Sequence, residues 1–526
     1  MTPSTLASVI TDSESITYHD DPLMLYQHLT GDAPHTMLLE SAEIDSKAHL
    51  KSMLLTHSAL MIRCDRYQLS FSALTDNGAQ LLNPINDFFA AQSTTQSTSH
   101  QDKQLIVTLT KVTQQQDEDA RLTSVSPLDG LRALVKHMHS KQAPAFEQLF
   151  LGGVLAYDLI DSVEPLPSVP DSENTCPDYL FYLAETLILV DHQTQHANII
   201  THVFTPNNQE ENSNTINTMA KRRNALQQLS QTLPQVAELK PIDDEVKVNV
   251  SDEDFKAQVT DLKSHIINGD IFQVVPSRSF SLPCPNTLGA YRALRLTNPS
   301  PYMFYVKGPD FTLFGASPES AIKYEASTNQ VEIYPIAGTR RRGKTADGEI
   351  DFDLDSRIEL DLRLDKKELS EHIMLVDLAR NDIARISQSG TRKVPELLKV
   401  DRYSHVMHLV SRVTGQLRQD LDALHAYQAC MNMGTLTGAP KVSAAQLIRS
   451  VEQSRRGSYG GAVGYLNGLG DMDTCIVIRS AFVKEGTAHI QAGAGVVFDS
   501  DPQAEADETR QKAQAVITAI KMGAGQ

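Results

Sequence analysis

The sequence predicts an α+β protein with much antiparallel strand pairing, and two observations point to this class. The first part of the chain alternates short apolar runs with turn-rich polar segments, which is typical of strands joined by turns. The second part mixes strands with long helices, but it lacks the regular strand–helix–strand alternation of a doubly wound parallel sheet. A chain of 526 residues is too long for one compact core, so two domains or one large two-part fold is expected.

Strands predominate in the first part. Four apolar runs are expected to form strands of a sheet: residues 36–42, 58–65, 67–74 and 103–112. The Ser-, Thr- and Gln-rich residues 90–104 are expected to form a low-complexity loop. The patterns that follow predict, in chain order, a glycine-bearing apolar stretch (150–161), a hairpin (186–204), a loop (206–215) and a helix (216–233).

A linker is expected at residues 234–250, which hold two prolines and several acids and lack helical spacing. It divides the chain into an N-terminal sheet-rich domain (1–240) and a second domain (251–520). The second domain opens with a capped helix, from Ser251 and the acids of its first turn to Asn268 and Gly269. Strands are expected beyond it at 311–316, 330–337 and 475–483.

Composition restricts the partners and the compartment. The net charge of −18 argues against nucleic acid or an anionic membrane surface, and it means that a site for an anionic substrate must supply its own positive charge. Five scattered cysteines lack metal-binding spacing and are typical of a reduced, cytoplasmic protein. The N-terminus does not have the pattern of a signal peptide, and no stretch is long and apolar enough to cross a bilayer.

Two segments each place a pair of glutamates on one helical face. Residues 366–386 have helical spacing with Glu368 and Glu371 three apart, and the segment that begins at Pro502 repeats this with Glu505 and Glu508. Four carboxylates on two helices can surround one hard cation such as Mg²⁺. The alternative for either pair is a solvated helix face, with a salt bridge between Glu508 and Lys512.

Other features leave two interpretations open. The Gly-Thr turn of PIAGTRRRG (335–343) and the glycine-rich segments 458–465 and 491–500 either turn backbone amides toward an anion or are ordinary turns. Arg479 lies in an apolar strand and needs an anion, which is either an internal carboxylate or a substrate. His408 is either a core residue or a catalyst.

Many motifs in a fixed order resemble the chorismate-utilising enzymes, and within that family the large subunits of bacterial anthranilate synthases. The resemblance covers almost all of residues 251–520, with a sparser match at LLESAEIDSK (38–47). It rests on GDIFQVVPSR, NPSPYMFY, FGASPES, PIAGTR, ELSEHIMLVDLARND, VDRYSHVMHLVSRV, GTLTGAPK, RRGSYGGAVGY, DTCIVIRS, QAGAGVV and EADETRQKA.

The resemblance implies a complex α/β sandwich of mainly antiparallel sheets flanked by helices, with chorismate as substrate and Mg²⁺ as cofactor. It implies Glu371 and Glu508 as metal ligands, with Glu368 and Glu505 as supporting carboxylates. It implies that Glu319 protonates the departing hydroxyl, that His408 takes part in the loss of pyruvate, and that Gln273 and Thr435 belong to the catalytic group. The residues that match the groups binding the two substrate carboxylates are Gly338, Thr339, Tyr459, Arg479, Gly493, Ala494, Gly495 and Lys512.

Two positions discriminate between the reactions of the family. Isochorismate synthases carry a Lys that activates water where this chain has Gln273, and aminodeoxychorismate synthases carry a nucleophilic Lys where it has Ala337. Both residues favour addition of ammonia to give 2-amino-2-deoxyisochorismate, and then loss of pyruvate to give anthranilate. The alternatives are an aminodeoxychorismate or isochorismate synthase. Arg341 replaces the Pro that is usual after GTR, and its effect is left open.

Partners and regulation are implied in the same way. The chain lacks the motifs of a glutaminase, so the resemblance implies a separate glutamine amidotransferase subunit, in a heterotetramer of two large and two small subunits. It also implies feedback inhibition by L-tryptophan, although on the residues alone LLES is only a strand end. The residues that match the feedback pocket are Glu40, Ser41, Lys51, Pro301, Tyr302 and Met303. A further alternative is a non-catalytic protein that binds tryptophan as a regulator.

Overall fold

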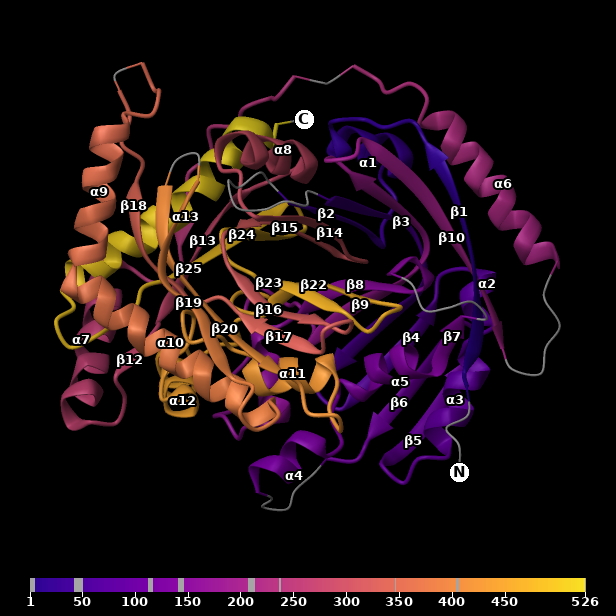
Figure 1. Ribbon diagram of the computed structural model, residues 1–526, viewed down its shortest axis with the longest axis horizontal. Helices are drawn as coiled ribbons and strands as arrows, with labels where there is room; N and C mark the ends of the chain where they lie inside the picture. The colour runs from indigo at the N-terminus through magenta and orange to yellow at the C-terminus, as the bar shows by residue number, and fades with distance from the viewer. Residues whose placement is uncertain are drawn as a thin grey trace.

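A computed structural model describes residues 5–41, 51–111, 117–140, 146–206, 213–235, 238–345, 347–403 and 406–525. Two long strands, β3 (Lys51–Asp65) and β9 (Tyr179–Asp191), pair along their whole lengths. Each of them takes part in two sheets, an upper and a lower one. Their register shifts between Leu55 and Leu60, where the two sheets diverge. In Figure 1 the sheets lie one above the other, with β2, β14, β15 and β24 in the upper layer and β8, β22, β23 and β16 in the lower.

In the upper sheet, β9 continues to β10 (His196–Pro206), β1 (Ala7–Ile16) and β7 (Met138–Ser140). β3 continues on its other side to the strands of the second half of the chain. These are, in spatial order, β2 (Thr36–Glu40), β14 (Tyr302–Lys307), β15 (Phe311–Ser317), β24 (Ser480–Lys484), β25 (Thr487–Gly493), β13 (Ser277–Pro283) and β11 (Lys247–Val248). Neighbours are antiparallel except β1 and β7.

In the lower sheet, β3 continues to β4 (Gln68–Ala73), β6 (Gln104–Leu109) and β5 (Thr95–Gln101). β9 continues in the other direction, with all neighbours antiparallel. The strands there are β8 (Phe150–Leu155), β22 (Ala462–Asn467), β23 (Met472–Ile476), β16 (Ser320–Glu325), β17 (Gln330–Ile333) and β20 (Val406–Gln416), and β20 also pairs with β18 (Ile336–Arg341) and β19 (Lys393–Arg402).

Apolar side chains from both sheets fill the space between them, as burial of one face of each sheet requires. Helices cover the outer faces. α1 (Pro22–Thr30), α8 (Thr287–Thr297) and α13 (Pro502–Gly523) pack on the upper sheet, while α10 (Lys366–Ile386) and α11 (Ala423–Cys430) pack on the lower. The predicted complex α/β sandwich is therefore confirmed.

Four further helices complete the covering. α7 (Asp252–Asn268) and α12 (Lys441–Glu452) share one apolar cluster, and α9 (Phe352–Leu364) packs on β19 and β20. α6 (Ser213–Leu229) lies outside β1 and β10 (Figure 1). Shorter helical segments are α2 (Asp76–Ala79), α3 (Leu82–Ala90), α4 (Glu118–Thr123), α5 (Asp129–His137), η1 (Phe146–Gln148) and η2 (Tyr157–Ser162), and β12 (Gln273–Val274) pairs with β21 (Gly438–Ala439).

The chain crosses between the sheets at two places that matter for function. Pro318 and Glu319 join β15 of the upper sheet to β16 of the lower. Val477, Ile478 and Arg479 join β23 of the lower sheet to β24 of the upper. Both crossings therefore bring a polar side chain to the place where the two sheets separate.

Several sequence predictions are confirmed, the first two at their predicted bounds. α10 covers residues 366–386, α7 begins after its cap Ser251 and ends before Gly269 in the left-handed conformation, and β9 and β10 form the predicted hairpin. Three of the four early strands are near their predicted bounds, and the run 58–65 is the second half of β3. The loop expected at 206–215 lies mostly outside the described residues.

Three predictions are wrong. The strand expected over 330–337 is two strands, because β17 ends at Ile333 and β18 begins at Ile336. Residues 95–101 form β5, a strand, where a loop was expected, because the turn at Asp102 and Lys103 folds them back on β6. This polar strand pairs on one side only, so it needs no apolar face. The strand expected over 475–483 is two strands, because Arg479 has a positive φ of 49° and the chain changes sheets there.

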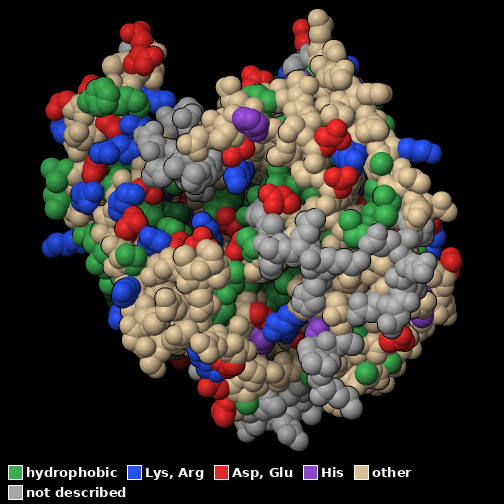
Figure 2. Space-filling view, turned by 45° about the vertical axis from the view of Figure 1, so that its right-hand side comes forward, with side chains coloured by type: hydrophobic (Ala, Val, Ile, Leu, Met, Phe, Trp, Pro, Cys, Tyr) green, Lys and Arg blue, Asp and Glu red, His purple; other side chains and the backbone are tan. Residues whose placement is uncertain are grey.

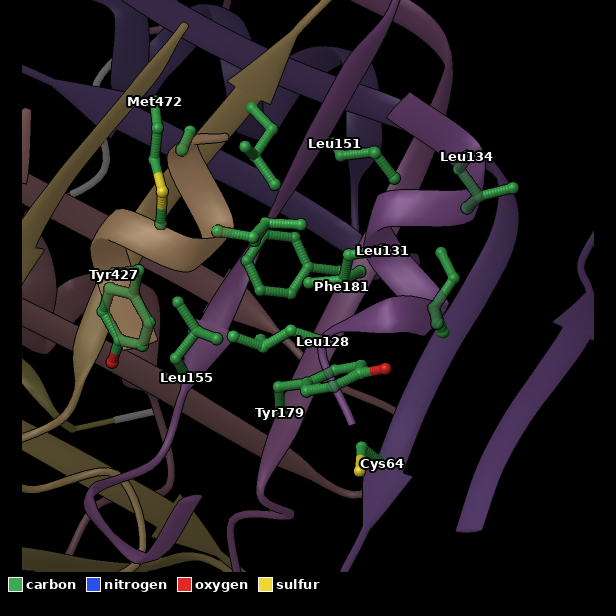
Figure 3. Close-up of a cluster of buried hydrophobic side chains, with 14 of the residues drawn as sticks. Cys64, Leu128, Leu131, Leu134, Leu151, Leu155, Tyr179, Phe181, Tyr427 and Met472 are labelled. Carbon is green, nitrogen blue, oxygen red and sulfur yellow. The ribbon is translucent and has the colours of Figure 1, made fainter. Parts of the chain in front are cut away.

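The two halves of the chain share strands and core. β2 pairs with β14, and β8 pairs with β22, so each sheet runs across the expected boundary near residues 240–251. The apolar cluster in Figure 3 joins Leu151, Tyr179 and Phe181 of the first half to Tyr427 and Met472 of the second. The division at 1–240 and 251–520 remains a prediction about the sequence. Three apolar clusters contain residues of both halves, and two smaller clusters have their buried residues in the second half alone.

Candidate active site

A cavity of about 720 Å³ opens where the two sheets separate. α10, α13, β18, β20 and the two crossing segments surround it. Of the predicted catalytic, carboxylate-binding and metal-binding residues, every one except Ala494 lines it: Gln273, Glu319, Gly338, Thr339, Glu368, Glu371, His408, Thr435, Tyr459, Arg479, Gly493, Gly495, Glu505, Glu508 and Lys512. Ala494 is fully buried behind this wall, where its amide donates to the carbonyl of Pro276 at 3.1 Å.

Glu319 is a buried acid at the cavity. Its Oε1 accepts a hydrogen bond of 3.0 Å from the Thr435 hydroxyl. Burial raises the pKa of Glu319 to about 8, although Thr435, Lys512 and Arg479 each act to lower it. The carboxyl group therefore keeps its proton at neutral pH, which is the state that a general acid needs.

Arg479 brings positive charge to the cavity wall. Among the described residues, no carboxylate lies within ion-pair distance of its guanidinium. Burial lowers the pKa of Arg479, while Tyr459, Glu508 and Glu319 act to raise it. A cation so placed requires an anion, and the cavity that Arg479 lines is where that anion can bind.

Tyr459 and Lys512 lie next to the glycine-rich end of β25. Lys512 Nζ donates to the carbonyl of Gly493 at 3.0 Å and pairs with Glu508 at 2.6 Å. Burial raises the pKa of Tyr459 to about 12, so its hydroxyl stays a donor. The predicted Glu508–Lys512 salt bridge is thus present, but both residues line the cavity and neither belongs to a fully solvated face.

Four carboxylates line the cavity from two helices, Glu368 and Glu371 of α10 and Glu505 and Glu508 of α13. Burial and the neighbouring Glu368 raise the pKa of Glu371, and burial raises that of Glu505. Glu505 Oε2 is buried without a hydrogen-bond partner. These oxygen donors fit Mg²⁺, whose charge would relieve their repulsion. As they stand, the described residues contain no group of three acids or histidines close enough together to hold a metal ion.

β18 brings the PIAGTR segment to the cavity through a bulge. Its register against β20 shifts between Ala337 and Thr339, and Gly338 in the bulge has a φ of +76°. A side chain at Gly338 would also lie 3.0 Å from Leu362 Cδ1 and 3.2 Å from Glu368 Oε2.

His408 lies on β20 next to this bulge. Thr339 Oγ1 and His408 Nδ1 share a hydrogen bond of 2.9 Å, and burial lowers the pKa of His408 to about 4. The imidazole is therefore neutral at neutral pH, and it is a weaker base than an exposed histidine.

The three arginines after Thr339 differ in their contacts. Arg340 pairs with Asp365 at 2.7 Å and with Glu368 at 2.8 Å. Arg342 pairs with buried Asp355 at 2.9 Å. Arg341 is exposed and lies at the edge of the cavity. This run is therefore neither an open solvated loop nor a shared anion site.

Gln273 completes the wall beside Glu371. Its Nε2 donates to Glu371 Oε1 at 3.1 Å, while its own Oε1 is buried without a hydrogen-bond partner. Ala337 also lines the cavity, so neither position offers a basic or nucleophilic nitrogen.

The cavity has polar residues that the sequence predictions missed: Lys367, Gln491 and Gln511. Gln511 lies one turn after Glu508 on α13, so helical spacing from a predicted ligand could have identified it. Lys367 is likewise one turn before Glu371. Gln491 precedes the glycine-rich turn and has no comparable signal.

The residues of the expected feedback pocket lie together only in part. Glu40 and Met303 are opposite each other on β2 and β14, and Glu40 accepts from the Tyr291 hydroxyl at 2.7 Å and pairs with Arg295 at 2.9 Å. Tyr302 points to the other face of the sheet, where its hydroxyl donates to Asp473 at 3.1 Å. Pro301 is buried, and Ser41 and exposed Lys51 flank a segment (42–50) outside the described residues.

Comparison with known proteins identifies the family. A family model of chorismate binding enzymes matches residues 86–518. The chain belongs to the chorismate binding enzymes. Over 503 residues it is 58% identical to anthranilate synthase component 1 of Vibrio cholerae, covering 96% of this chain and 94% of that protein. Over 503 residues it is 54% identical to anthranilate synthase component 1 of Escherichia coli, covering 96% and 95%.

Solved structures of chorismate binding enzymes have the same fold. Anthranilate synthase component I of Streptococcus pneumoniae matches with a TM-score of 0.69 at 29% identity, over 96% of this chain and 99% of that one. The menaquinone-specific isochorismate synthase of Escherichia coli matches with a TM-score of 0.65, over 99% and 96%, but at 16% identity it shows the fold alone. The family resemblance inferred from the motifs is confirmed, and within the family the chain is grouped with the component 1 proteins of anthranilate synthase.

On the face in Figure 2, acidic and basic side chains of the described residues are intermixed. No helix in the described part of the chain has the length and apolar character needed to span a membrane.

Proposed function

We propose that this protein converts chorismate and ammonia to anthranilate and pyruvate, as the first committed step of tryptophan biosynthesis. Gln273 provides the main support among the site residues. Its amide cannot deprotonate water, but its buried, unpartnered Oε1 can accept a hydrogen bond from ammonia. Ala337 removes the lysine that covalent attack on the ring would need.

The site residues divide into groups with separate tasks. Arg479, Tyr459 and Lys512 bind the substrate carboxylates, with the Gly338–Thr339 backbone on the opposite wall. Glu319 donates its proton to the departing ring hydroxyl, which its raised pKa permits at neutral pH. His408 is neutral and accepts the ring proton whose removal accompanies the loss of pyruvate.

The metal is assigned to the same wall. Glu371 and Glu508 would hold Mg²⁺, with Glu368 and Glu505 supporting it. When bound, Mg²⁺ would act as a Lewis acid that stabilises negative charge on the substrate. Glu368 pairs with Arg340 at 2.8 Å. Its proposed task is therefore to orient the two metal ligands and to balance the charge beside them.

The direct test incubates the full-length chain with chorismate, Mg²⁺ and an ammonium salt and records anthranilate fluorescence. Anthranilate is the expected product, and its formation excludes a purely regulatory role. Isochorismate or aminodeoxychorismate as the main product, identified by mass and retention time, would overturn the proposal. The Gln273→Lys variant provides a comparison, because a lysine there should divert product toward isochorismate.

We further propose that a separate glutamine amidotransferase subunit delivers the ammonia in the cell, within a heterotetramer of two copies of each chain. The chain has no nucleophilic Cys in glutaminase surroundings, and its described cysteines are all buried. Adding that subunit should confer glutamine-dependent activity on a chain that alone requires ammonium.

Feedback inhibition by L-tryptophan is proposed at the end of β2 and the start of β14. Ser41→Phe and Met303→Thr should leave ammonia-dependent activity near its original value and weaken inhibition by tryptophan, because both residues lie outside the cavity. Isothermal titration with tryptophan measures the binding directly. Unchanged tryptophan affinity in both variants would remove this assignment.

A further inference from the structure

The segment Arg455–Gly461 brings Tyr459 to the active-site cavity. It joins α12 to β22 and has no regular secondary structure of its own over most of its length. Its backbone conformation therefore depends on what it contacts. Those contacts come largely from the first half of the chain, from η2 and from the irregular segment 170–178 before β9.

Asp158 of η2 makes the most direct of these contacts. Its Oδ2 accepts a hydrogen bond of 2.7 Å from the Gly457 amide, and its Oδ1 accepts one of 2.7 Å from Arg449 of α12. Arg455 Nε lies 3.7 Å from the same carboxylate, and Asp158 is fully buried. One carboxylate of the first half thus contacts α12 and the start of the turn that leads to Tyr459.

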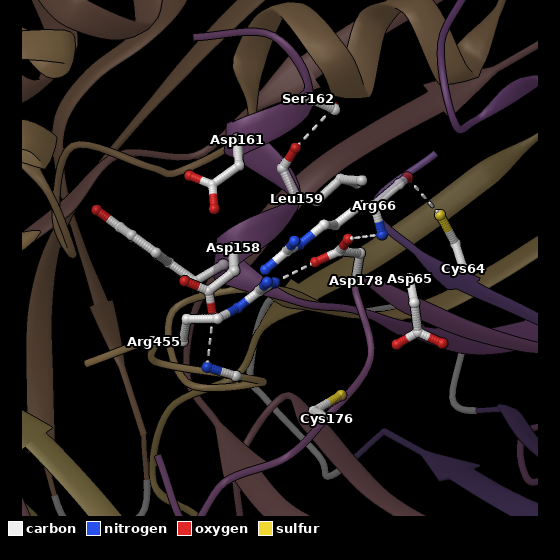
Figure 4. A network of polar contacts seen from close by, with 12 residues as sticks. Cys64, Asp65, Arg66, Asp158, Leu159, Asp161, Ser162, Cys176, Asp178 and Arg455 are labelled. Atoms are coloured by element: carbon white, nitrogen blue, oxygen red, sulfur yellow. Dashed lines mark hydrogen bonds and ion pairs between the residues drawn. The ribbon is translucent and has the colours of Figure 1, made fainter. Parts of the chain in front are cut away.

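A second acid strengthens this connection. Arg455 also pairs with Asp178, which in turn accepts from the Arg66 amide at 2.5 Å. Figure 4 shows Arg455 between Asp158 and Asp178, with Asp161 close by. Asp161 accepts from Arg449 at 2.9 Å. Without Asp158, Arg449 would keep exposed Asp161 and Arg455 would keep buried Asp178. The contact that neither of these acids supplies is the hydrogen bond to the Gly457 amide.

Backbone and side-chain contacts fix the rest of the segment. The Tyr157 amide donates to the Gly457 carbonyl at 2.9 Å, and Asn174 Nδ2 donates to the Ser458 hydroxyl at 2.9 Å. Gly457 has a φ of +60°, and a side chain there would lie 2.2 Å from the Asn174 carbonyl oxygen. A side chain at position 457 would therefore force the turn away from Asn174.

Arg456 links the turn at Gly457 to the ring of Tyr459. Its guanidinium lies over the rings of Tyr157 at 4.6 Å and Tyr459 at 5.5 Å, and it pairs with Glu452 at 2.6 Å. A shift of the turn would therefore move Arg456 and, with it, the ring that faces the cavity.

We propose that Asp158 is a positioning residue for substrate binding: through Gly457, Arg449 and Arg455 it holds the turn that places Tyr459 in the cavity. The first half of the chain would then set the substrate affinity of a site built by the second half. This inference rests on the proposed function for its kinetic readout, but its structural readout does not depend on any reaction.

The test compares Asp158→Asn with a matched control, Glu185→Gln, in the full-length chain. Glu185 is also fully buried and paired with an arginine, Arg222, and it accepts from the Thr75 hydroxyl at 2.7 Å, but it lies on β9 and is not part of the cavity wall. Both variants should lower the melting temperature. Asp158→Asn alone should raise the KM for chorismate about 10- to 100-fold, the range for loss of one charge-assisted contact, with kcat changed much less.

Two further measurements separate positioning from general damage. Hydrogen exchange at the amides of Gly457 to Gly461 should accelerate in Asp158→Asn but not in Glu185→Gln. In a double-mutant cycle, Tyr459→Phe combined with Asp158→Asn should raise KM no more than the larger single effect. A milder variant, Ser458→Ala, removes only the side-chain contact with Asn174 and should leave the chain folded. It should show smaller increases in KM and in the exchange rate of the turn.

Equal KM changes in Asp158→Asn and Glu185→Gln would overturn the proposal, as would additive effects in the cycle or unchanged exchange in the turn. If the chain forms no anthranilate at all, the proposed function fails. The exchange experiment then still decides whether Asp158 holds the turn.

Discussion

Glu319 lies between β15 and β16, where the chain leaves one sheet and enters the other. This position buries the carboxyl group against the sheet core while its tip faces the cavity, and burial outweighs the opposing effects of Thr435, Lys512 and Arg479 on its pKa. The sequence motif SPES identifies this residue only through family resemblance. No pattern of residues reveals that a glutamate after a strand will be buried at a sheet crossing.

The pKa of about 8 for Glu319 predicts the alkaline limb of the pH profile. At a fixed concentration of free ammonia, kcat/KM for chorismate should fall as pH rises through about 8, because Glu319 then loses the proton that it donates. Thr435→Val removes the hydrogen bond that lowers this pKa, so the limb should move to higher pH. Glu319→Gln should lower kcat about 10²- to 10⁴-fold, the usual contribution of a general acid. A limb that stays in place in Thr435→Val would contradict the assignment.

At the scale of elements, helices were predicted more accurately than strands. The bounds of α10 agree with the prediction because its capping residue Asp365 and its apolar spacing are both local features. β5 was missed because its pairing partner, β6, determines it, and its own residues are polar. The break at Arg479 was missed because the segment reads as one apolar run, while the change of sheet depends on strands distant in sequence.

The carboxylates that α10 and α13 place on the cavity wall predict how the metal affects stability. Glu371→Gln removes one charge from a wall where burial and neighbouring acids already raise the pKa of Glu371 and Glu505. Without metal, this variant should be at least as stable as the original chain. It should lose the rise in melting temperature that Mg²⁺ gives by binding the folded state, and calorimetric titration should show weaker Mg²⁺ binding.

Asp377→Asn is the control on the same helix. Asp377 is exposed and pairs with Arg380 at 2.6 Å, away from the cavity. It should keep the Mg²⁺ response of the original chain. An unchanged Mg²⁺ response in Glu371→Gln, with activity within tenfold, would reject Glu371 as a ligand.

At the scale of the whole molecule, both sheets continue across the boundary that the sequence predicts near residues 234–250. Composition and the proline-bearing segment near 234–250 predict a boundary, because both are properties of a local stretch of chain. Pairing of β2 with β14 and of β8 with β22 is long-range, so nothing at the boundary signals it. The same is true of the contacts that Asp158 makes with the turn before Tyr459.

This shared architecture predicts the behaviour of the separated parts. Residues 251–526 expressed alone would lose β2 and β8, which leaves the edges of β14 and β22 unpaired and uncovers buried Phe304, Val463 and Val477 between the sheets. Unpaired edges beside exposed apolar surface favour association, so this fragment should aggregate or lack a cooperative thermal transition. Co-expression with residues 1–240 should restore a one-to-one complex with ammonia-dependent activity, because the strands can pair without a covalent link. Size-exclusion chromatography and calorimetry measure both outcomes. A monomeric, cooperatively folding and active fragment 251–526 would show instead that the first half is an addition to a self-sufficient catalytic domain.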